Sequence, residues 1–321
     1  MAVYTEISDD ELDVLLDQYD LGQALSCKGI AEGVENSNFL LHTEAGYYIL
    51  TLYEKRVNAE DLPFFLGLME HLATGGFISP RPISAKDGRN LKEVVGRPSA
   101  IIEFLDGRSV RRITPQHCAL LGQTLAQLHT IGSDFKLQRE NTLSLSAWRP
   151  LYDACRKSGD GSMGADFFPE IESEISYLED HWPTDIPSGV IHADLFPDNI
   201  FFLNDKVSGV IDYYFACNDF FAYDLAICLN AWCFENDGSF NITKARKLLN
   251  GYREVRDFSR QELNFLPLLC RGAALRFLLT RLFDWLNQVD GALVKPKDPQ
   301  EYFKKLQFHQ AVTSVEAYGL E

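Results

Sequence analysis

Residues 188–224 read SGVIHADLFPDNIFFLNDKVSGVIDYYFACNDFFAYD. A short apolar run, typical of a buried strand, leads into the polar loop 192–199. Two further apolar runs fill 200–211 and are separated by Asn204 and Asp205, a pair typical of a hairpin turn. The stretch therefore predicts a small two-stranded ribbon with the polar loop at one end.

The ribbon is expected to bring three oxygen-bearing side chains together. Because hairpin strands run antiparallel, Asp194 and Asn199 before the ribbon and Asp212 after it are expected to lie at one edge. Two carboxylates and an amide oxygen suit an Mg²⁺ ion that bridges the phosphates of a nucleotide. One carboxylate then remains to accept the proton of an attacking hydroxyl group.

The spacing of these residues supports the same chemistry. His192-x-Asp194-x4-Asn199 fits the H-x-D-x4-N pattern of kinase catalytic loops, and Asp212 takes the place of the aspartate in the metal-binding D-F-G motif. A solvated polar loop is the alternative interpretation. An apolar hairpin that ends in aspartate is not expected after such a loop, so the pattern favours Mg²⁺-assisted phosphoryl transfer.

Composition limits the classes of function. A formal net charge of -16 over 321 residues argues against general binding to nucleic acid or acidic membranes, because such binding needs a basic surface. The seven cysteines lack zinc-site spacing, which favours a reduced, cytoplasmic protein. No signal peptide and no run of about 18 apolar residues is seen, and no obligatory protein partner is evident.

The first part of the chain, 1–104, is expected to be an antiparallel sheet with one main helix. Ser8 and Glu11 form a capping box that opens a short helix, which is expected to pack on this lobe. Strand-like runs follow, and the helix 59–73 is inserted after the third of them. The five expected strands are 26–30, 38–43, 47–53, 90–95 and 99–104.

After Phe104 the chain becomes polar and then helical, so 105–321 is expected to form a larger, mostly helical lobe. Thr114 caps and Pro115 opens its first helix. His129 near the end of that helix is expected to be a structural histidine. Further helices are expected at 145–157, 168–181, 223–234, 242–255, 263–287 and 300–315. The expected fold class is α+β.

The segment 29–38, between the first two strands, carries glycines that let the backbone approach a ligand closely. Asn36, Ser37 and Asn38 in this segment offer amide and hydroxyl groups. A hairpin turn that only needs positive φ angles explains the glycines equally well.

The helix 263–287 places Arg271, Arg276 and Arg281 among apolar residues, and charged groups in such a setting need partners. Salt bridges between helices and contacts with an anionic group of a substrate are the two interpretations that this pattern leaves open.

The chain resembles the aminoglycoside-phosphotransferase-like small-molecule kinases and, within them, the homoserine kinases of that type. The wider resemblance rests on the sequences of 190–199, 209–212 and 223–226. In this branch the residue after His192 is usually small, as Ala193 is here. The narrower resemblance rests on 2–6, 33–38, 48–53, 107–110 and 271–277.

The resemblance implies a two-lobed, protein-kinase-like fold, ATP and Mg²⁺ as cofactors, and a role for each matched residue. Asp194 is the implied catalytic base, and Asn199 and Asp212 are the implied metal ligands. His192 and Asp224 are implied to support the loop without reacting. The implied nucleotide-binding residues are Gly33, Asn36, Ser37, Asn38, Thr51 and the adenine hinge of Glu103 and Leu105.

Two departures from the general kinase pattern stand out. The third strand carries Thr51 where a phosphate-binding lysine is usual, and Lys55 or Arg56 at the strand end are candidate substitutes. Homoserine kinases of this type are similar in having the threonine, so it is interpreted as a subfamily trait. Tyr213 and Tyr214 replace the Phe-Gly of the D-F-G motif, which argues against an activation-loop switch of that kind.

The resemblance implies transfer of the γ-phosphate of ATP to the side-chain hydroxyl of L-homoserine, a step of threonine biosynthesis. By residue type, Arg276 or another arginine of the same helix is expected to bind the substrate carboxylate. Asp219, Asp284 or nearby backbone carbonyls are expected to bind the ammonium group, and Tyr213 is expected to line the substrate site. The alternatives are the same chemistry on choline, methylthioribose or an aminoglycoside, and a catalytically silent nucleotide-binding module.

Overall fold

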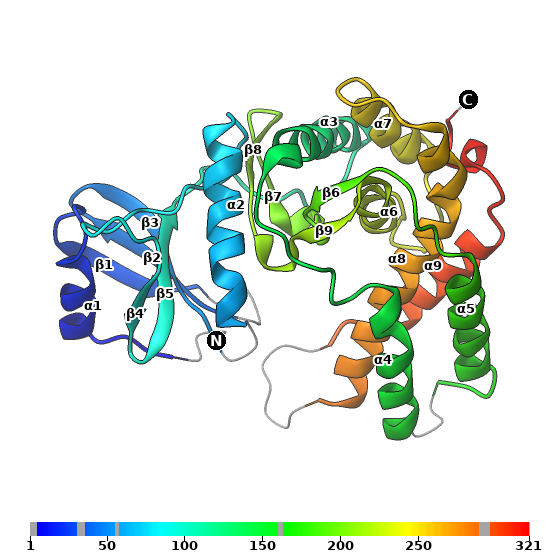
Figure 1. Cartoon of the computed structure of the whole chain (residues 1–321), viewed down its shortest axis with the longest axis horizontal. Helices are drawn as coiled ribbons and strands as arrows, with labels where there is room; N and C mark the ends of the chain where they lie inside the picture. Colours follow the sequence, from blue (N-terminus) through cyan, green and yellow to red (C-terminus); the bar gives the residue numbers. More distant parts are fainter. Residues whose placement is uncertain (1–4, 31–35, 55–57, 160–162, 289–295, 321) are drawn as a thin grey trace. The chain divides into compact units, whose positions relative to one another are not determined.

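The computed structural model describes residues 5–30, 36–54, 58–159, 163–288 and 296–320. The chain divides into two compact units, which are described separately (Figure 1). The first unit consists of Met1–Arg108, Phe135–Arg139 and Phe201–Tyr214, and the second contains the remaining residues. The first unit therefore ends its main run four residues after the predicted boundary and also includes the hairpin of the quoted stretch.

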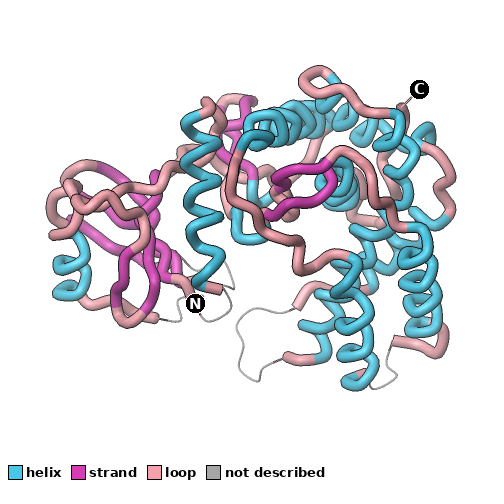
Figure 2. The backbone as a smooth tube through the Cα atoms, in the orientation of Figure 1, coloured by secondary structure: helices cyan, strands magenta, loops and turns pink. Residues whose placement is uncertain are grey.

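The first unit contains the predicted five-stranded antiparallel sheet, in the order β1-β2-β3-β5-β4 (Figure 2). Along β2 the residues Ser37, Phe39, Leu41 and Thr43 are buried and alternate with less buried ones, as one face of a strand requires. The strands are β1 (Ala24–Gly29), β2 (Ser37–Thr43), β3 (Gly46–Leu52), β4 (Lys92–Val94) and β5 (Arg97–Glu103).

Helix α1 (Asp9–Leu16) packs on this sheet, as predicted. Its N-terminus is closed by the capping box of Ser8 and Glu11, because the Ser8 backbone amide donates to the Glu11 carboxylate at 2.9 Å and the Ser8 hydroxyl accepts from the Glu11 amide. The apolar side of α1 and the sheet share one core, formed by Leu12, Leu15, Leu16, Tyr19, Phe39, Leu41, Leu50, Leu52 and Ile101 among others.

The predicted helix in the sheet lobe is a 3₁₀ turn, η1 (Ala59–Asp61), followed by α2 (Leu62–Thr74). Phe64 of α2 contacts Phe135 edge to face, with ring centroids 5.5 Å apart, and Phe65 contacts Tyr214 at 5.6 Å. These aromatic pairs attach the segments 135–139 and 201–214 to the first unit.

The predicted hairpin is formed by β7 (Ile200–Leu203) and β8 (Lys206–Val210). Its turn residues Asn204 and Asp205 have φ angles of 49° and 58°, the left-handed pair of a type I′ turn that matches the twist of the strands. At Gly209 a Cβ would lie 2.8 Å from the Leu105 side chain, so only glycine permits this contact with the segment after β5.

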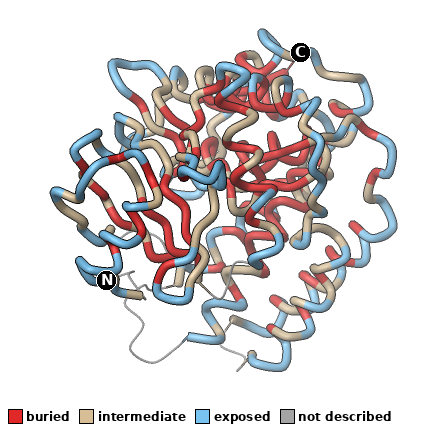
Figure 3. Tube along the Cα trace, turned by 60° about the vertical axis from the view of Figure 1, so that its left-hand side comes forward, coloured by how far each residue is buried: buried red, intermediate tan, exposed pale blue. Residues whose placement is uncertain are grey.

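The second unit is mostly helical, and its core is buried among its central helices (Figure 3). A small two-stranded sheet of β6 (Ser188–Ile191) and β9 (Cys217–Phe220) lies within it. Its helices are α3 (Pro115–Ile131), α4 (Leu145–Ser158), α5 (Phe167–His181), α6 (Phe221–Trp232), α7 (Ile242–Arg253), α8 (Arg260–Leu286) and α9 (Gln300–Gln310), with 3₁₀ turns η2 (Gly132–Asp134), η3 (Pro197–Asn199) and η5 (Val315–Tyr318). The 3₁₀ turn η4 (Tyr213–Phe215) contains residues of both units.

One expectation for this part of the chain was wrong, and one strand was missed. The last helix was expected to reach residue 315, but α9 ends at Gln310 and the chain is extended at Ser314 before η5. The β-branched Val312 and Thr313 lie at this break and disfavour a continued helix. Strand β9 was not predicted, because residues 217–220 pair with β6, and their own pattern of apolar and polar residues is too short to indicate a strand.

Helix α8 has the length and mean hydropathy of a membrane span, and 67% of its apolar window is buried inside the protein. It begins with a capping box of Ser259 and Glu262 and packs mainly against α4, α6 and α9. Helix α8 therefore has the setting of a central core helix.

Candidate active site

In the polar loop that follows β6, the predicted catalytic base Asp194 and the predicted metal ligand Asn199 are in contact. The Asn199 side-chain amide donates to the Asp194 backbone carbonyl at 2.8 Å and to the Asp194 carboxylate at 3.2 Å. Asn199 is buried at the end of η3, and Asp194 is partly exposed. Because the amide nitrogen of Asn199 is used in this way, its Oδ1 atom remains as a ligand for a cation.

Asp224, at the start of α6, holds the backbone of the same loop. Its fully buried carboxylate accepts hydrogen bonds from the backbone amides of His192 at 2.8 Å and Ala193 at 2.9 Å. The His192 ring is buried too, and its Nδ1 accepts the Asp194 backbone N–H at 3.3 Å. These contacts are those expected of residues that support the loop without reacting.

His129 of α3 extends this support into the core. Its Nε2 lies 3.1 Å from the Asp224 carboxylate and its Nδ1 lies 2.8 Å from the Tyr252 hydroxyl, to which Arg256 donates. Burial lowers the pKa of His129, so the ring is neutral and donates from Nε2. Burial would raise the pKa of Asp224, but the hydrogen bonds from His129 and the loop keep that pKa below its usual range.

Asp212 lies two residues after β8, is exposed, and has a left-handed φ of 65°. It belongs to the first unit, whereas Asp194 and Asn199 belong to the second, so the convergence of all three stays a prediction. Among the described residues, no group of three His, Cys, Asp or Glu side chains forms a metal site. The predicted ligands, the Asp212 carboxylate and the Asn199 amide oxygen, are of the kind that suits an Mg²⁺ ion, which would take its other ligands from water and phosphate.

The polar residues expected to bind nucleotide form hydrogen bonds within the first unit. The buried Thr51 hydroxyl donates at 2.8 Å to Oδ1 of Asn38, its partner in the antiparallel pairing of β2 and β3. Asn36 accepts the backbone N–H of Glu54, and the Ser37 hydroxyl donates to the Glu54 carboxylate at 2.8 Å. These side chains therefore stabilise the ends of β2 and β3, and their contacts with nucleotide stay predictions.

Glu54 is the centre of this network and was missed by the sequence analysis. Its carboxylate also accepts from the Thr5 hydroxyl at 2.7 Å and lies 3.4 Å from Arg97. A glutamate directly after the third strand was the available signal. The network links Thr5, near the start of the chain, to the end of β3.

Other predicted nucleotide residues are placed in part. Gly33 and the candidate lysine substitutes Lys55 and Arg56 lie outside the described residues. Glu103, at the end of β5, accepts the backbone N–H of Arg81 at 3.0 Å through its carboxylate. Leu105 packs against Gly209, as described above.

The three arginines of α8 have different partners. Arg271 forms a two-point ion pair with Glu174 of α5, at 2.7 and 2.6 Å, and Arg281 pairs with Glu301 of α9 at 2.6 Å. These two residues follow the interpretation of salt bridges between helices. Arg276 is 2% exposed and donates to the Ala193 backbone carbonyl at 2.6 Å.

Of the other expected substrate residues, Asp219 lines a hollow and Tyr213 is buried. Asn141, which was also missed, donates to the Asp219 carboxylate at 2.7 Å, and the Phe220 amide donates to it as well. Burial raises the pKa of Asp219 in spite of these bonds. The alternative ammonium partner Asp284 is exposed on α8.

The hollow at Asp219 has a volume of about 490 Å³ and lies within the second unit. Its other lining residues include Ser144, Arg149, Glu179 and Trp182, of which Arg149 and Glu179 are ion-paired. A cavity with both charges and hydroxyl groups suits a small zwitterion.

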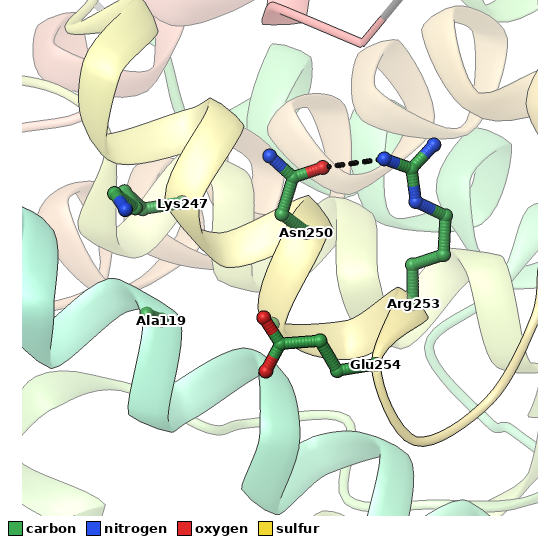
Figure 4. A pocket seen from close by; sticks show the side chains of 6 residues that line it. Ala119, Lys247, Asn250, Arg253 and Glu254 are labelled. Carbon is green, nitrogen blue, oxygen red and sulfur yellow. Dashed lines mark hydrogen bonds between the residues drawn. The ribbon is translucent and has the colours of Figure 1, made fainter.

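A second hollow of about 340 Å³ lies on the surface between α3 and α7 (Figure 4). It is lined by Ala119, Lys247, Asn250, Gly251, Arg253 and Glu254, and Arg253 donates to Asn250 at 3.0 Å. None of the predicted site residues lines it.

Comparison with protein families places the chain. The model of the family described as "Phosphotransferase enzyme family" matches residues 26–258, which include the loop with Asp194 and Asn199 and also Asp212 and Asp224. The chain belongs to this phosphotransferase family. As a phosphotransferase it acts on a small-molecule substrate and uses ATP, and its fold class is the predicted α+β, protein-kinase-like one.

Curated relatives of this phosphotransferase match it over its whole length. A protein named homoserine kinase from Paramagnetospirillum magneticum is 60% identical, and the match covers 100% of both chains. One of the same name from Parvibaculum lavamentivorans is 59% identical with the same coverage, and one from Rhizobium meliloti is 58% identical over 100% of this chain and 98% of its own.

Solved structures of similar fold are distant in sequence. An amicoumacin kinase superposes with a TM-score of 0.70 at 16% identity, covering 95% of this chain and 92% of its own. A spectinomycin phosphotransferase gives 0.66 at 15% identity with 98% of both chains covered, and a choline kinase from Cryptosporidium parvum gives 0.62 at 15% with 89% and 88% covered. At these identities the likeness concerns the fold.

Proposed function

We propose that this chain is an ATP- and Mg²⁺-dependent kinase that transfers the γ-phosphate of ATP to the side-chain hydroxyl of L-homoserine, in the cytoplasm. The observation that carries the proposal is the identity of 58–60% to relatives named homoserine kinase, over nearly the whole of every chain. The same narrower group was implied by the sequence motifs outside the polar loop.

In the proposed reaction the hydroxyl oxygen of homoserine forms a bond to the γ-phosphorus as the bond to ADP breaks. Asp194 accepts the hydroxyl proton, because it is a carboxylate that is partly exposed. Positioning and neutralisation of phosphate charge are expected to supply most of the rate. Asn199 Oδ1 and the Asp212 carboxylate would hold the Mg²⁺ ion, which neutralises phosphate charge when bound.

The hollow at Asp219 is the proposed place of the amino-acid part of the substrate. The Asp219 carboxylate would accept from the ammonium group, since a carboxylate in a partly buried site gains from an opposite charge. A cation is still required for the substrate carboxylate. Arg149 lines the same hollow and is the proposed partner, through Nη1, because Glu179 and Ser176 accept from Nε and Nη2.

ADP release by the purified protein tests the proposal. Homoserine, choline, methylthioribose and kanamycin are each supplied with Mg·ATP, with Asp194→Asn as the background for contaminating ATPase. Homoserine is expected to be turned over at least about a hundredfold faster than the other three at equal concentration. Equal rates would contradict the substrate assignment, and EDTA is expected to stop turnover until Mg²⁺ is added back.

Absence of turnover with every alcohol would favour the silent module, which the missing third-strand lysine suggests. Measurements of ATP binding then decide between the silent module and an active kinase. An active kinase is expected to bind ATP with an Mg²⁺ requirement, because Asn199 and Asp212 have no basic neighbour in the sequence to replace the ion.

A further inference from the structure

Arg276 has surroundings that differ from those of the other arginines on α8. Arg271 and Arg281 are paired with carboxylates, whereas among the described residues Arg276 forms no ion pair within 4.0 Å. A guanidinium that is 2% exposed is costly to bury without a counter-charge. The contacts of the buried guanidinium must therefore offset this cost.

The Arg276 guanidinium is directed at the candidate catalytic loop. Nη1 donates to the Ala193 carbonyl at 2.6 Å, and the guanidinium carbon lies 4.6 Å from the ring centroid of Phe277 and 5.7 Å from that of Phe215. The two rings favour a cation at this point and limit the movement of the side chain. A charged donor makes a stronger hydrogen bond to a carbonyl than a neutral one does.

The residue that receives this bond has an unusual backbone. Ala193 has a φ of 61°, in the left-handed region that disfavours residues with a Cβ. Asp224 holds the peptide group before it through the Ala193 amide. Such a conformation persists only where the surrounding contacts hold it.

The peptide group between Ala193 and Asp194 is held at both of its polar atoms. Its carbonyl oxygen accepts from Arg276 at 2.6 Å, and its N–H, which belongs to Asp194, donates to His192 Nδ1 at 3.3 Å. The plane of this peptide sets the direction in which the Asp194 side chain leaves the backbone. Arg276 thus acts on Asp194 through this peptide group.

We propose that Arg276 is a positioning residue for phosphoryl transfer, which fixes the Ala193–Asp194 peptide and thereby aims the Asp194 carboxylate at the acceptor hydroxyl. The catalytic part rests on the proposed function. This role uses the guanidinium inside the protein and leaves the substrate carboxylate to another cation.

Kinetics of Arg276→Met test the catalytic part. Methionine keeps an unbranched side chain in the core but removes the charge and the hydrogen bond. The kcat is expected to fall about 10- to 100-fold, the scale of a misplaced catalytic group, with little change in the KM for homoserine or ATP. A raised KM for homoserine at unchanged kcat would overturn the proposal in favour of a substrate contact.

Arg271→Met is the matched control, because it removes a buried ion pair from the same helix. It is expected to lower Tm and leave kcat within about twofold. If it lowered kcat as far as Arg276→Met does, a general effect of α8 on activity would replace the positioning role. If Arg276→Met fails to fold, Arg276→Lys replaces it, because lysine keeps the charge and a hydrogen-bond donor. The kcat of Arg276→Lys is expected to be lower than that of wild type by less than about tenfold.

A rescue experiment separates positioning from a merely structural role. Glycine adopts the left-handed conformation readily, so Ala193→Gly makes the loop less dependent on the bond from Arg276. Arg276→Met is expected to lower kcat at least about threefold less in the Ala193→Gly background than in the wild-type background. Simple additivity of the two changes would contradict the proposal.

Hydrogen exchange tests the positioning part without any substrate. The amides of residues 192–196 are expected to exchange at least about tenfold faster in Arg276→Met than in wild type. Their exchange is expected to be unchanged in Arg271→Met, because the charge-assisted hydrogen bond to the Ala193 carbonyl is lost only in Arg276→Met. Unchanged exchange overturns the proposal whichever alcohol is the substrate. If the wild type does not turn over homoserine but exchange is faster in Arg276→Met, the proposed function is contradicted and the positioning of the peptide is not.

Discussion

Left-handed backbone marks two points of the candidate active site, Ala193 directly before Asp194 and Asp212 itself. Non-glycine residues adopt this conformation at a cost of about 1–2 kcal/mol, which other contacts must offset. At Ala193 those contacts are visible, because Asp224 and Arg276 hold the peptide groups on its two sides. Ala193 is therefore supported by side chains from α6 and α8 that are distant in sequence.

Substitution of Asp194 is the most direct test at this scale. Asp194→Asn is expected to fold normally and lose at least about a hundredfold in kcat, since an amide cannot accept the hydroxyl proton. Asp198→Asn is the control, because Asp198 lies exposed in the same loop. Turnover is followed by ADP release and folding by Tm. A near-wild-type rate for Asp194→Asn would remove Asp194 from the chemistry.

At the scale of elements, helices α3 and α7 of the second unit pack with their backbones in contact. A Cβ at Gly251 of α7 would overlap the carbonyl oxygen of Ala119 on α3, and one at Gly122 of α3 would overlap the backbone of Leu248. Glycine at these two positions lets the backbones touch. The contact matters for the site because α3 also carries His129, which supports Asp224.

Gly251→Ala is expected to lower the free energy of unfolding by about 1–3 kcal/mol, because the added methyl group forces the two helices apart. Urea denaturation measures the change. Gly132→Ala serves as the control, since its Cβ would lie at an ordinary 3.6 Å from Val190, and it is expected to be neutral or slightly stabilising. Equal stability of both variants would show that the helices separate without cost.

The C-terminal elements are joined by a buried histidine. His309 of α9 contacts the Tyr318 hydroxyl of η5 at 2.8 Å and the Asn230 side chain of α6 at 3.2 Å. Burial, with the nearby charges of Lys305 and Arg271, lowers the pKa of His309 to about 3. The ring is therefore neutral in the folded protein.

This histidine predicts a loss of stability in mild acid. In the unfolded chain His309 titrates near pH 6.5, so between pH 6.5 and 3 the unfolded state binds more protons and stability falls as pH falls. From pH 7 to 5 the loss due to His309 is about 2 kcal/mol. Urea denaturation is expected to show a smaller loss in His309→Gln than in wild type or in the exposed control His181→Gln. Parallel curves would contradict the expectation.

At the scale of the whole molecule, charge is the dominant general feature. A net charge of -16 repels itself in the folded state, while many ion pairs on the surface, such as Lys86 with Asp20, are exposed and contribute little. Shielding of the net repulsion should therefore outweigh the weakening of these pairs.

Added salt is expected to stabilise the protein. Raising NaCl from about 0.01 to 0.1 M shortens the screening length from about 30 to about 10 Å, so repulsion across the molecule is reduced. A gain of about 1 kcal/mol corresponds to a rise in Tm of about 2 °C. Calorimetry in a buffer without Mg²⁺ measures it. A fall in Tm would mean that surface ion pairs outweigh the net charge.

The sequence by itself determined the reaction class, the antiparallel five-stranded sheet with its inserted helix, and most helix starts. Those features depend on neighbours within a few positions: the H-x-D-x4-N spacing, the Asn204–Asp205 turn, and the caps at Ser8 and Thr114. Local capping and turn geometry act before tertiary contacts form, so their signals are written in short stretches.

Only the tertiary structure decided which partners the polar residues have. Arg276 meets Ala193 across 83 positions, His129 meets Asp224 across 95, and β9 forms only because β6 is beside it. Burial makes such partners necessary, but residue type alone does not select them, because any donor or acceptor that packing brings near will serve. For this reason residue type suggested a substrate carboxylate as the partner of Arg276, whereas the structure shows a hydrogen bond to the Ala193 carbonyl.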